Sequence, residues 1–226
     1  TRPSLPPDFE RACDEAWARM RVAPGFLTER EGRFLALVAA AAPATGVILE
    51  IGSFKGKSTV GLATIARRYA LGTVVAVDPF TAPSVTDPDL RGAASSFDDF
   101  QRTLRSAELE SQVEVHRARS SDLATEWNRP IRFLWIDGDH TYAGARLDFD
   151  LYRPHLADGA VVALHDALSN FDGPIRVFAE LILPSNDFGP AGFVGSIAWA
   201  QYRPRDGATP YFRDRRLRLA RKASRL

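Results

Sequence analysis

Two short runs of acidic and histidine residues come directly after apolar stretches that we predict to be β-strands. The first run, DGDH, follows residues 131–136, and the second run, HD, follows residues 160–164. Because neighbouring parallel strands end at the same edge of a sheet, we expect these side chains to converge on one pocket. The ionisable members of the two runs are Asp137, Asp139, His140, His165 and Asp166.

Three carboxylates and two imidazoles in one pocket require a cation or protonation, because close carboxylates raise one another's pKa. Oxygen-rich clusters with few nitrogens suit Mg²⁺, Mn²⁺ or Ca²⁺ better than structural zinc. Asp139 and His140 are also candidate general bases, since the ordinary pKa of histidine suits proton transfer near neutrality. The alternative is purely structural: Asp139 caps a helix that begins near Tyr142, and His165 forms a hydrogen bond at the end of the sheet.

A glycine-containing turn, GSFKG, lies between a predicted strand at residues 47–51 and a helix that begins at about Ser58. Glycine there permits positive φ and lets the backbone approach a ligand closely. Gly52 and Gly56 enclose three residues, whereas a phosphate-binding P-loop needs four between its first glycine and the Gly-Lys-Ser. The dinucleotide pattern G-x-G-x-x-G also fails, because Phe54 stands two residues after Gly52. We therefore expect neither nucleotide hydrolysis nor pyrophosphate binding.

An acidic residue, Asp78, ends the second predicted strand, 26 residues after Gly52. A carboxylate at this place can accept both hydroxyls of a ribose. A short glycine turn followed by such a carboxylate is the pattern expected for S-adenosylmethionine, which has no phosphate to cradle. Glu50, just before the turn, either orients the turn or forms an ion pair with the ammonium group of this ligand. In the structural alternative, Glu50 only pairs with Lys55 or Lys57.

The elements that must position these residues alternate along the chain. Thr28 and Glu31 form a capping box that begins a helix. Strands that are apolar on both faces and separated by helices predict a parallel sheet covered on both sides, whereas the alternating residues 193–202 predict an antiparallel edge hairpin. The expected helices are 8–22, 28–42, 58–70, 97–107 and 142–154, and the expected parallel strands are 47–51, 73–77, 113–117, 131–136 and 160–164.

The composition bounds the class of protein. A chain of 226 residues with 45% hydrophobic residues suits one globular domain, and a net charge of +1 gives no field that would attract nucleic acid or a membrane. The single cysteine, Cys13, excludes an internal disulfide and a Cys-rich zinc site. No apolar run approaches the roughly 20 residues of a membrane span, and no export signal is recognised, so a cytoplasmic location is expected.

The motifs LEIGSFKGKSTVGLA, VDPF and FLWIDGDHTYAGARLDFDLYRPHLADGAVVALHDA together resemble the class I S-adenosylmethionine-dependent methyltransferases. Within them, the sequence is most similar to the small-molecule branch that includes macrolide-sugar O-methyltransferases and cephalosporin-hydroxylase-like proteins. The resemblance covers roughly residues 28–202. It implies a Rossmann-like, doubly wound α/β fold with a mostly parallel seven-stranded sheet.

The resemblance also implies roles for particular residues. Asp137, His165 and Asp166 take the positions of divalent-metal ligands, with His165 replacing an acidic residue found in several relatives. Asp139 is favoured over His140 as the base. Ser120 and Ser121 lie near the adenine, although this pair could equally be a helix N-cap. The residues implied to line the cofactor are Glu50, Gly52, Ser53, Ser58, Asp78 and Asp137.

We therefore expect one methyltransferase domain, with an N-terminal arm and helix (1–27), a core (28–202) and a basic tail (203–226). The expected reaction is O-methylation of a small molecule such as a sugar, a glycosylated natural product or a phenol, assisted by a divalent metal such as Mg²⁺. The loop at 81–96 is expected to cover the pocket, and its lack of aromatic side chains disfavours nucleic acid.

Three questions stay open at this stage. The protein could be a non-catalytic S-adenosylmethionine-binding accessory of the same fold, or, less favoured, an RNA methyltransferase. The basic tail is either a solvated helix or frayed end, or a contact for a phosphorylated ligand or an acidic partner. A homo-oligomer is possible, because the apolar helix at 8–22 could serve a dimer.

Overall fold

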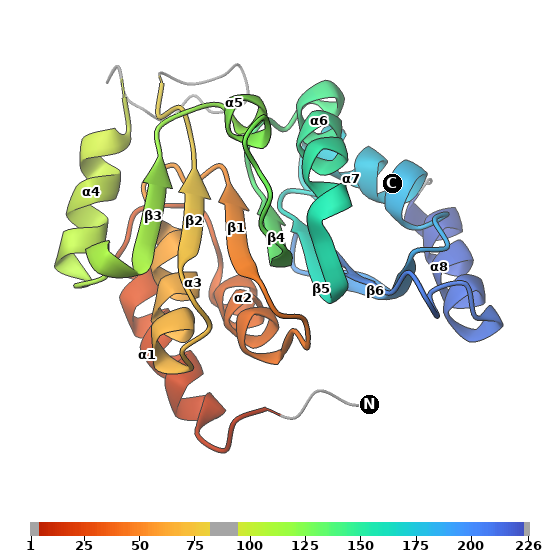
Figure 1. The fold of residues 1–226 in the computed structure, drawn as a ribbon, viewed down its shortest axis with the longest axis horizontal. Coiled ribbons are helices and arrows are strands. Elements are labelled where there is room, and N and C mark those ends of the chain that lie inside the picture. The colour runs from red at the N-terminus through yellow and green to blue at the C-terminus, as the bar shows by residue number, and fades with distance from the viewer. Residues whose placement is uncertain (1–4, 82–94, 224–226) are drawn as a thin grey trace.

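The computed structural model describes residues 5–81 and 95–223. Their core is one seven-stranded sheet with the strand order β3-β2-β1-β4-β5-β7-β6 (Figure 1). The first five strands pair in parallel, and β7 pairs antiparallel with both β5 and β6. The predicted doubly wound sheet with an antiparallel edge hairpin is confirmed. The strands are β1 (Val47–Ile51), β2 (Val74–Val77), β3 (Val113–His116), β4 (Ile131–Ile136), β5 (Leu156–Leu164), β6 (Phe188–Val194) and β7 (Ile197–Tyr202).

Helices flank both faces of this sheet (Figure 1). The helix that begins at Thr28 has the predicted capping box, with the Thr28 side chain accepting from the Glu31 amide and Glu31 accepting from the Thr28 amide. The α-helices are α1 (Phe9–Met20), α2 (Glu29–Ala41), α3 (Lys57–Arg68), α4 (Phe97–Ser106), α5 (Ser120–Ala124), α6 (Tyr142–Tyr152), α7 (Gly173–Val177) and α8 (Pro210–Ala223). Two 3₁₀ turns (Glu110–Gln112 and Arg153–His155) and a π-helix (Phe178–Ile182) complete the set.

Successive strand residues point to opposite faces, and the two faces bury different helices. On one face, Val74, Ala76 and Trp135 pack with the buried sides of α1, α2 and α3. On the other, Val75 and Leu134 pack with residues of α6 and α7. Burial on both sides explains why β1, β2 and β4 are apolar at every position except Glu50 and Arg132. It leaves the carboxyl ends of the strands as the edge on which polar groups can gather.

The structure extends the sequence prediction in three places. β5 begins at Leu156 rather than residue 160, because Leu156 pairs with Ile131 of β4, and the register shifts before Val161 pairs with Phe133. The five-residue helices α5 and α7 were not predicted, since one turn of helix is too short to show a period. Of the loop at 81–96, only the ends are described, joined by a bridge between Thr81 and Ser95; the predicted cover over the pocket lies outside the described residues.

The C-terminal basic segment forms α8, at the β6 edge of the sheet (Figure 1). Arg216 anchors this helix: the side chain is 2% exposed and donates to the carbonyl oxygens of Leu183, Ser185, Phe188 and Gly207. The predicted helix is therefore part of the fold, with one arginine acting as a structural donor.

The apolar side of α1 is buried inside the chain against α2 and α3, through Ala12, Cys13, Ala16 and Met20. Whether the chain forms an oligomer stays a prediction.

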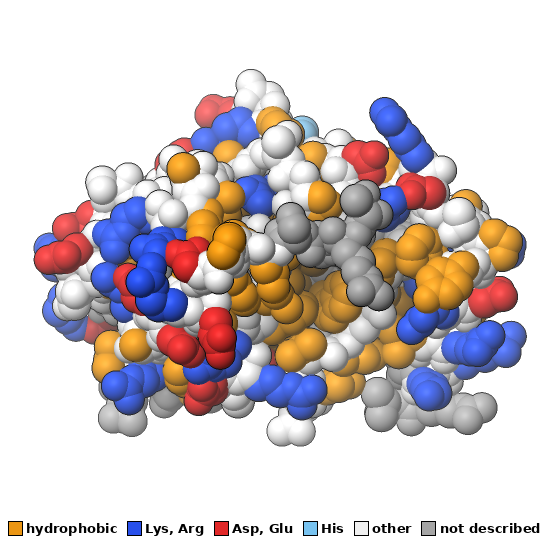
Figure 2. All heavy atoms as spheres, turned by 90° about the horizontal axis from the view of Figure 1, so that it is seen from below, with side chains coloured by type: hydrophobic (Ala, Val, Ile, Leu, Met, Phe, Trp, Pro, Cys, Tyr) orange, Lys and Arg blue, Asp and Glu red, His pale blue; other side chains and the backbone are white. Residues whose placement is uncertain are grey.

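Hydrophobic side chains gather near the middle of the face that carries the amino ends of the strands (Figure 2). No helix within the described ranges is both long and apolar enough to cross a membrane.

Candidate functional site

Strand register brings the polar turns together at the carboxyl edge of the sheet. Ile51 of β1 pairs with Ile136 of β4, and Ile136 pairs with Leu164 of β5. The backbone continues this pairing one residue further, because the Asp137 amide donates to the Ile51 carbonyl (2.8 Å) and the His165 amide donates to the Ile136 carbonyl (3.0 Å). The glycine turn and the two acid–histidine runs therefore begin side by side.

The glycine turn needs its first glycine for two reasons. Gly52 has φ of +84°, a conformation that favours glycine, and a Cβ built there would lie 2.1 Å from the Asp137 carbonyl oxygen. The turn therefore packs directly on the backbone after β4, and only a residue without a side chain fits.

Glu50 is fully buried behind the turn and accepts three hydroxyl hydrogen bonds. Its donors are Ser53 (3.0 Å), Ser58 (2.5 Å) and Thr59 (2.5 Å). Burial raises the pKa of Glu50 to about 7 against the pull of these hydroxyls. These contacts fit the role in which Glu50 orients the turn. The alternative ion pairs are not formed, because Lys55 pairs with Asp99 and Lys57 donates to the Gly25 carbonyl. Contact of Glu50 with the ammonium group of a ligand stays a prediction.

Replacing Glu50 with Gln is expected to remove a pH-dependent loss of stability. Because the folded-state pKa of about 7 lies above the ordinary 4.5, the native state holds this proton more tightly, and wild-type stability falls as pH rises from 4.5 through 7. The full loss of wild-type stability, about 3 kcal/mol at most, is reached above pH 7. Urea unfolding at pH 5 and pH 8 measures it: the wild type should lose more stability between these pH values than Glu50→Gln. Equal losses in both proteins would contradict the buried carboxyl.

Asp78 secures the same turn from β2. Its Oδ2 accepts from the amides of Ser53 and Phe54, both at 2.8 Å, and its Oδ1 accepts from the Phe80 amide at 2.6 Å. The side chain lines a cavity at the position where the sequence predicts the ribose. Its binding of a ribose stays a prediction.

Two cavities of about 480 Å³ each open at this edge and share Gly52, Phe54, Asp137 and Gly138. We name them by their lining. The serine-side cavity is lined by residues that include Asp78, Ser120, Ser121, Asp139 and Asp148. The histidine-side cavity is lined by residues that include Phe26, Ser53, Ser58, His140, His165, Asp166 and Phe171. The two cavities therefore adjoin at the four shared residues.

The serine pair opens α5 but does not cap it. Arg119 is the N-cap residue and makes no side-chain capping hydrogen bond, so the N-cap alternative for Ser120 and Ser121 is wrong. Ser120 instead donates its hydroxyl to Asp148 Oδ1. Both serines lie in the cavity wall, where their hydroxyls can meet a polar ligand.

Asp148 is a candidate site residue that sequence reasoning missed. It is 5% exposed on α6, yet it lines the serine-side cavity, and burial raises its pKa to about 6. The only sequence signal was an acidic residue, in DFDLY, at a position that the helical period places on the buried side.

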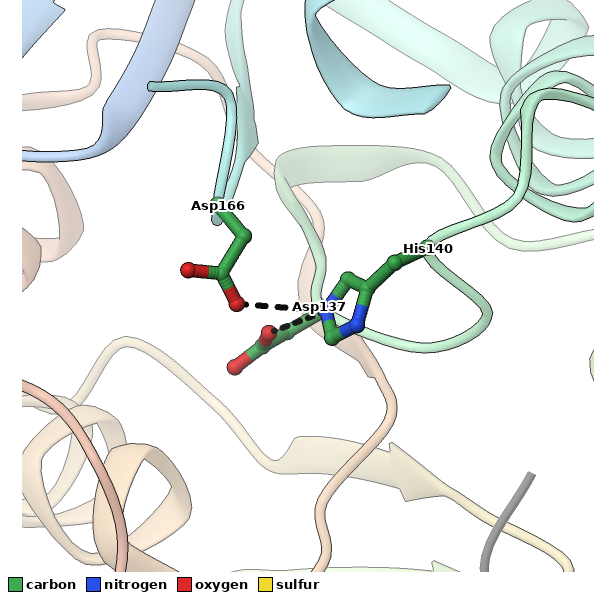
Figure 3. A group of neighbouring side chains, drawn as sticks. All are labelled: Asp137, His140 and Asp166. Carbon is green, nitrogen blue, oxygen red and sulfur yellow. Dashed lines mark hydrogen bonds and ion pairs between the residues drawn. The ribbon is translucent and has the colours of Figure 1, made fainter. Parts of the chain in front are cut away.

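Asp137, His140, His165 and Asp166 form one group, which we call the acid–histidine cluster (Figure 3 draws three of them). His140 Nε2 lies 3.5 Å from Asp137 Oδ1 and 3.4 Å from Asp166 Oδ2. His165 Nδ1 lies 3.0 Å from Asp137 Oδ1 and 3.3 Å from Asp166 Oδ2. Both histidines therefore face the same two carboxylates.

These contacts set the charges of the cluster. Burial alone would lower the pKa of His165, but Asp137 and Asp166 outweigh it and raise that pKa to about 11. Burial also lowers the pKa of His140, but the neighbouring Asp137 outweighs burial, so this pKa is raised. The pKa of Asp137 is lowered, because the two imidazoles outweigh its burial. The two carboxylates thus favour the protonated form of both imidazoles.

Glu31 extends the cluster toward the edge hairpin. Its Oε1 accepts from the Ser196 amide and hydroxyl, both at 2.7 Å, and lies 4.0 Å from His165 Nε2. The capping-box glutamate thus fixes the β6–β7 turn and places a negative charge behind His165.

The two candidate bases lie in different cavities. His140 lines the histidine-side cavity, whereas Asp139 lines the serine-side cavity and its Oδ1 accepts from the Thr141 amide at 2.8 Å. The helix after them is capped by Thr141, not by Asp139.

Ligand atoms of Asp137, His140 and Asp166 all lie within 4.8 Å of one another. Among the described residues, His140 Nδ1 is buried without a hydrogen-bond partner, and the Nε2 contacts of 3.4–3.5 Å are long for direct hydrogen bonds. Two carboxylates and one imidazole at this spacing fit a divalent cation.

Comparison with protein families matches residues 49–167, more than half of the chain, to a methyltransferase domain. The fold is similar to that of a methyltransferase from Geobacter sulfurreducens (22% identity, 89% of this chain and 91% of that chain, TM-score 0.59). It is also similar to an O-methyltransferase from Bacillus cereus in complex with SAH (19%, 88% and 92%, TM-score 0.59) and to CalS11, a calicheamicin methyltransferase (14%, 88% and 95%, TM-score 0.56).

At these identities the solved structures establish the fold alone, whereas the family match covers both the glycine turn and the acid–histidine cluster. The chain therefore belongs to the methyltransferase-domain family and is a class I S-adenosylmethionine-dependent methyltransferase.

Proposed function

We propose that the protein transfers a methyl group from S-adenosylmethionine to a hydroxyl of a small molecule, with a divalent cation held by the acid–histidine cluster. The observation that carries this proposal is the position of the acid–histidine cluster. The cluster lines the histidine-side cavity, and this cavity shares Gly52 and Asp137 with the serine-side cavity. Donor and acceptor can thus lie on either side of one junction.

The serine-side cavity suits the adenosine half of the cofactor. Asp78 and Asp148 offer carboxylates, and Ser120 and Ser121 offer hydroxyls. Apolar side chains in the same wall are Ile51, Val77 and Leu147. S-adenosylmethionine, when bound, supplies a methyl group on a sulfonium. The chain's own task is to hold this group and the acceptor in line, since orientation accounts for much of the barrier reduction in such transfers.

Asp137, His140 and Asp166 are the proposed cation ligands. The cation supplies Lewis acidity that lowers the pKa of a hydroxyl next to it. His165, whose Nδ1 faces both carboxylates, is the proposed positioning residue for them, in place of the ligand role that the sequence implied. Asp139 remains the predicted base; full turnover of Asp139→Asn would exclude it.

Mn²⁺ titration followed by electron paramagnetic resonance tests the cation site. We expect one Mn²⁺ per wild-type chain and at least tenfold weaker binding to Asp166→Asn, because one of three ligands loses its charge. Asp172→Asn, whose side chain is 76% exposed, is the matched control and should bind as the wild type does. If the wild type binds no Mn²⁺, or if Asp166→Asn binds it equally well, the cation part of the proposal is wrong.

A further inference from the structure

Aromatic rings stand at two places in the wall of the histidine-side cavity. Phe26, before α2, stacks on Phe54 of the glycine turn, with ring centroids 6.3 Å apart and planes at 19°. Phe171, after β5, stacks on His140 with centroids 4.6 Å apart and planes at 17°. Phe26 is 66% exposed, so a ligand that covers it with apolar surface gains hydrophobic free energy.

Phe54 is held in an unusual conformation at the junction of the two cavities. Its φ of +45° is rare for a bulky residue and costs about 1 kcal/mol or more. The Asp78 carboxylate fixes this conformation by accepting from the Phe54 amide. This conformation places an aromatic side chain in the wall of both cavities, where the methyl donor and the methyl acceptor must meet.

The polar lining groups near these rings already have protein partners. The serine hydroxyls of the turn donate to Glu50. Lys57 Nζ donates to the Gly25 carbonyl (3.2 Å), and Lys55 Nζ pairs with Asp99 (3.3 Å). In the described part of the wall, polar groups that face the cavity for a ligand are thus concentrated in the acid–histidine cluster.

We propose that the acceptor is a hydroxylated aromatic ring, bound against Phe26, Phe54 and Phe171 with its hydroxyl at the acid–histidine cluster. This inference rests on the proposed function, because it names the substrate class of the same site. A planar ring with a polar group at one edge matches a wall that offers phenylalanine rings beside the charged acid–histidine cluster. A sugar carries hydroxyls on all sides, and those next to the phenylalanines lose their water without gaining partners.

The test measures the binding of catechol and of methyl glucoside to the full chain, saturated with S-adenosylhomocysteine and Mg²⁺, by calorimetry. Catechol is expected to bind at least tenfold more tightly than methyl glucoside. Phe26→Ala should weaken catechol binding about tenfold, because an aromatic contact and its buried area are lost, and Phe171→Leu should weaken it as well. Tyr211→Ala removes a ring of similar exposure (63%) on α8 and should leave the affinity unchanged.

Methyl transfer to the same two compounds, measured as release of S-adenosylhomocysteine from S-adenosylmethionine, separates the two proposals. Methylation of catechol with the expected variant pattern supports both. Transfer to methyl glucoside but not to catechol, or a Phe26→Ala affinity within twofold of wild type, overturns the aromatic acceptor and leaves O-methyl transfer standing. Catechol binding with the expected pattern but no transfer supports the aromatic site and contradicts O-methyl transfer.

Discussion

Replacing Asp137 with Asn is expected to lower the rate of methyl transfer about 1,000-fold, or about 4 kcal/mol of barrier, which matches the several kcal/mol that a bound metal ion contributes. Asp137 Oδ1 is the atom that both His140 and His165 approach, and its side chain is a proposed cation ligand. An amide at this position loses the charge that organises the cluster. The measurement is release of S-adenosylhomocysteine with the best acceptor of the catechol and glucoside pair.

Asp150→Asn is the matched control for this change. Asp150 lies on α6 and pairs with Arg146 on the surface, a contact worth about 0.2–1 kcal/mol, so its turnover should equal that of the wild type. Thermal unfolding of both variants separates a catalytic loss from a folding loss. Turnover of a folded Asp137→Asn within threefold of wild type would remove the cluster from the mechanism.

Replacing Gly52 with Ala is expected to have the largest effect on the cofactor. The new Cβ would stand 2.1 Å from the Asp137 carbonyl oxygen at a φ of +84°, so the turn must move or the strands must separate. Overpacking of this kind costs about 1–3 kcal/mol, in addition to the strain of a positive φ. We expect a fall in thermal stability and at least a 100-fold loss of S-adenosylhomocysteine affinity, measured by calorimetry.

Gly72→Ala separates the effect of a positive φ from the effect of a steric clash. Gly72 has φ of +90°, but a Cβ built there meets nothing within 4 Å. This variant should lose about 1 kcal/mol of stability and keep its cofactor affinity. If Gly52→Ala behaves like Gly72→Ala in both measurements, close packing at Gly52 does not shape the site.

Much of the fold follows from local pattern. The strands at 47–51 and 131–136 are apolar except at Glu50 and Arg132 and are bounded by turn residues, so their limits are predicted to the residue. The capping box of Thr28 likewise fixes the start of α2. The short helices and the early start of β5 depend on tertiary contacts, which a sequence pattern does not show.

Part of the candidate site can likewise be predicted from the sequence, and part depends on the folded structure. Strand ends predict that Asp137, His165 and Asp166 converge, and they do. The partition of Asp139 and His140 between two cavities depends on the path of the turn after β4, where Gly173 packs against the His140 carbonyl oxygen so closely that a Cβ there would lie 2.2 Å from it. Phe171 enters the site from a distant loop, and no spacing rule links it to His140.

Calorimetric titration of the full chain with S-adenosylhomocysteine tests the central claim most directly. The two adjoining cavities, with Asp78 and Gly52 in their walls, predict binding at one site per chain. NADH and ATP, titrated in the same way, should give no comparable heat, because the turn lacks both phosphate-binding patterns. Failure of the folded wild-type chain to bind S-adenosylhomocysteine, or equal binding of NADH, would contradict the assignment of this site.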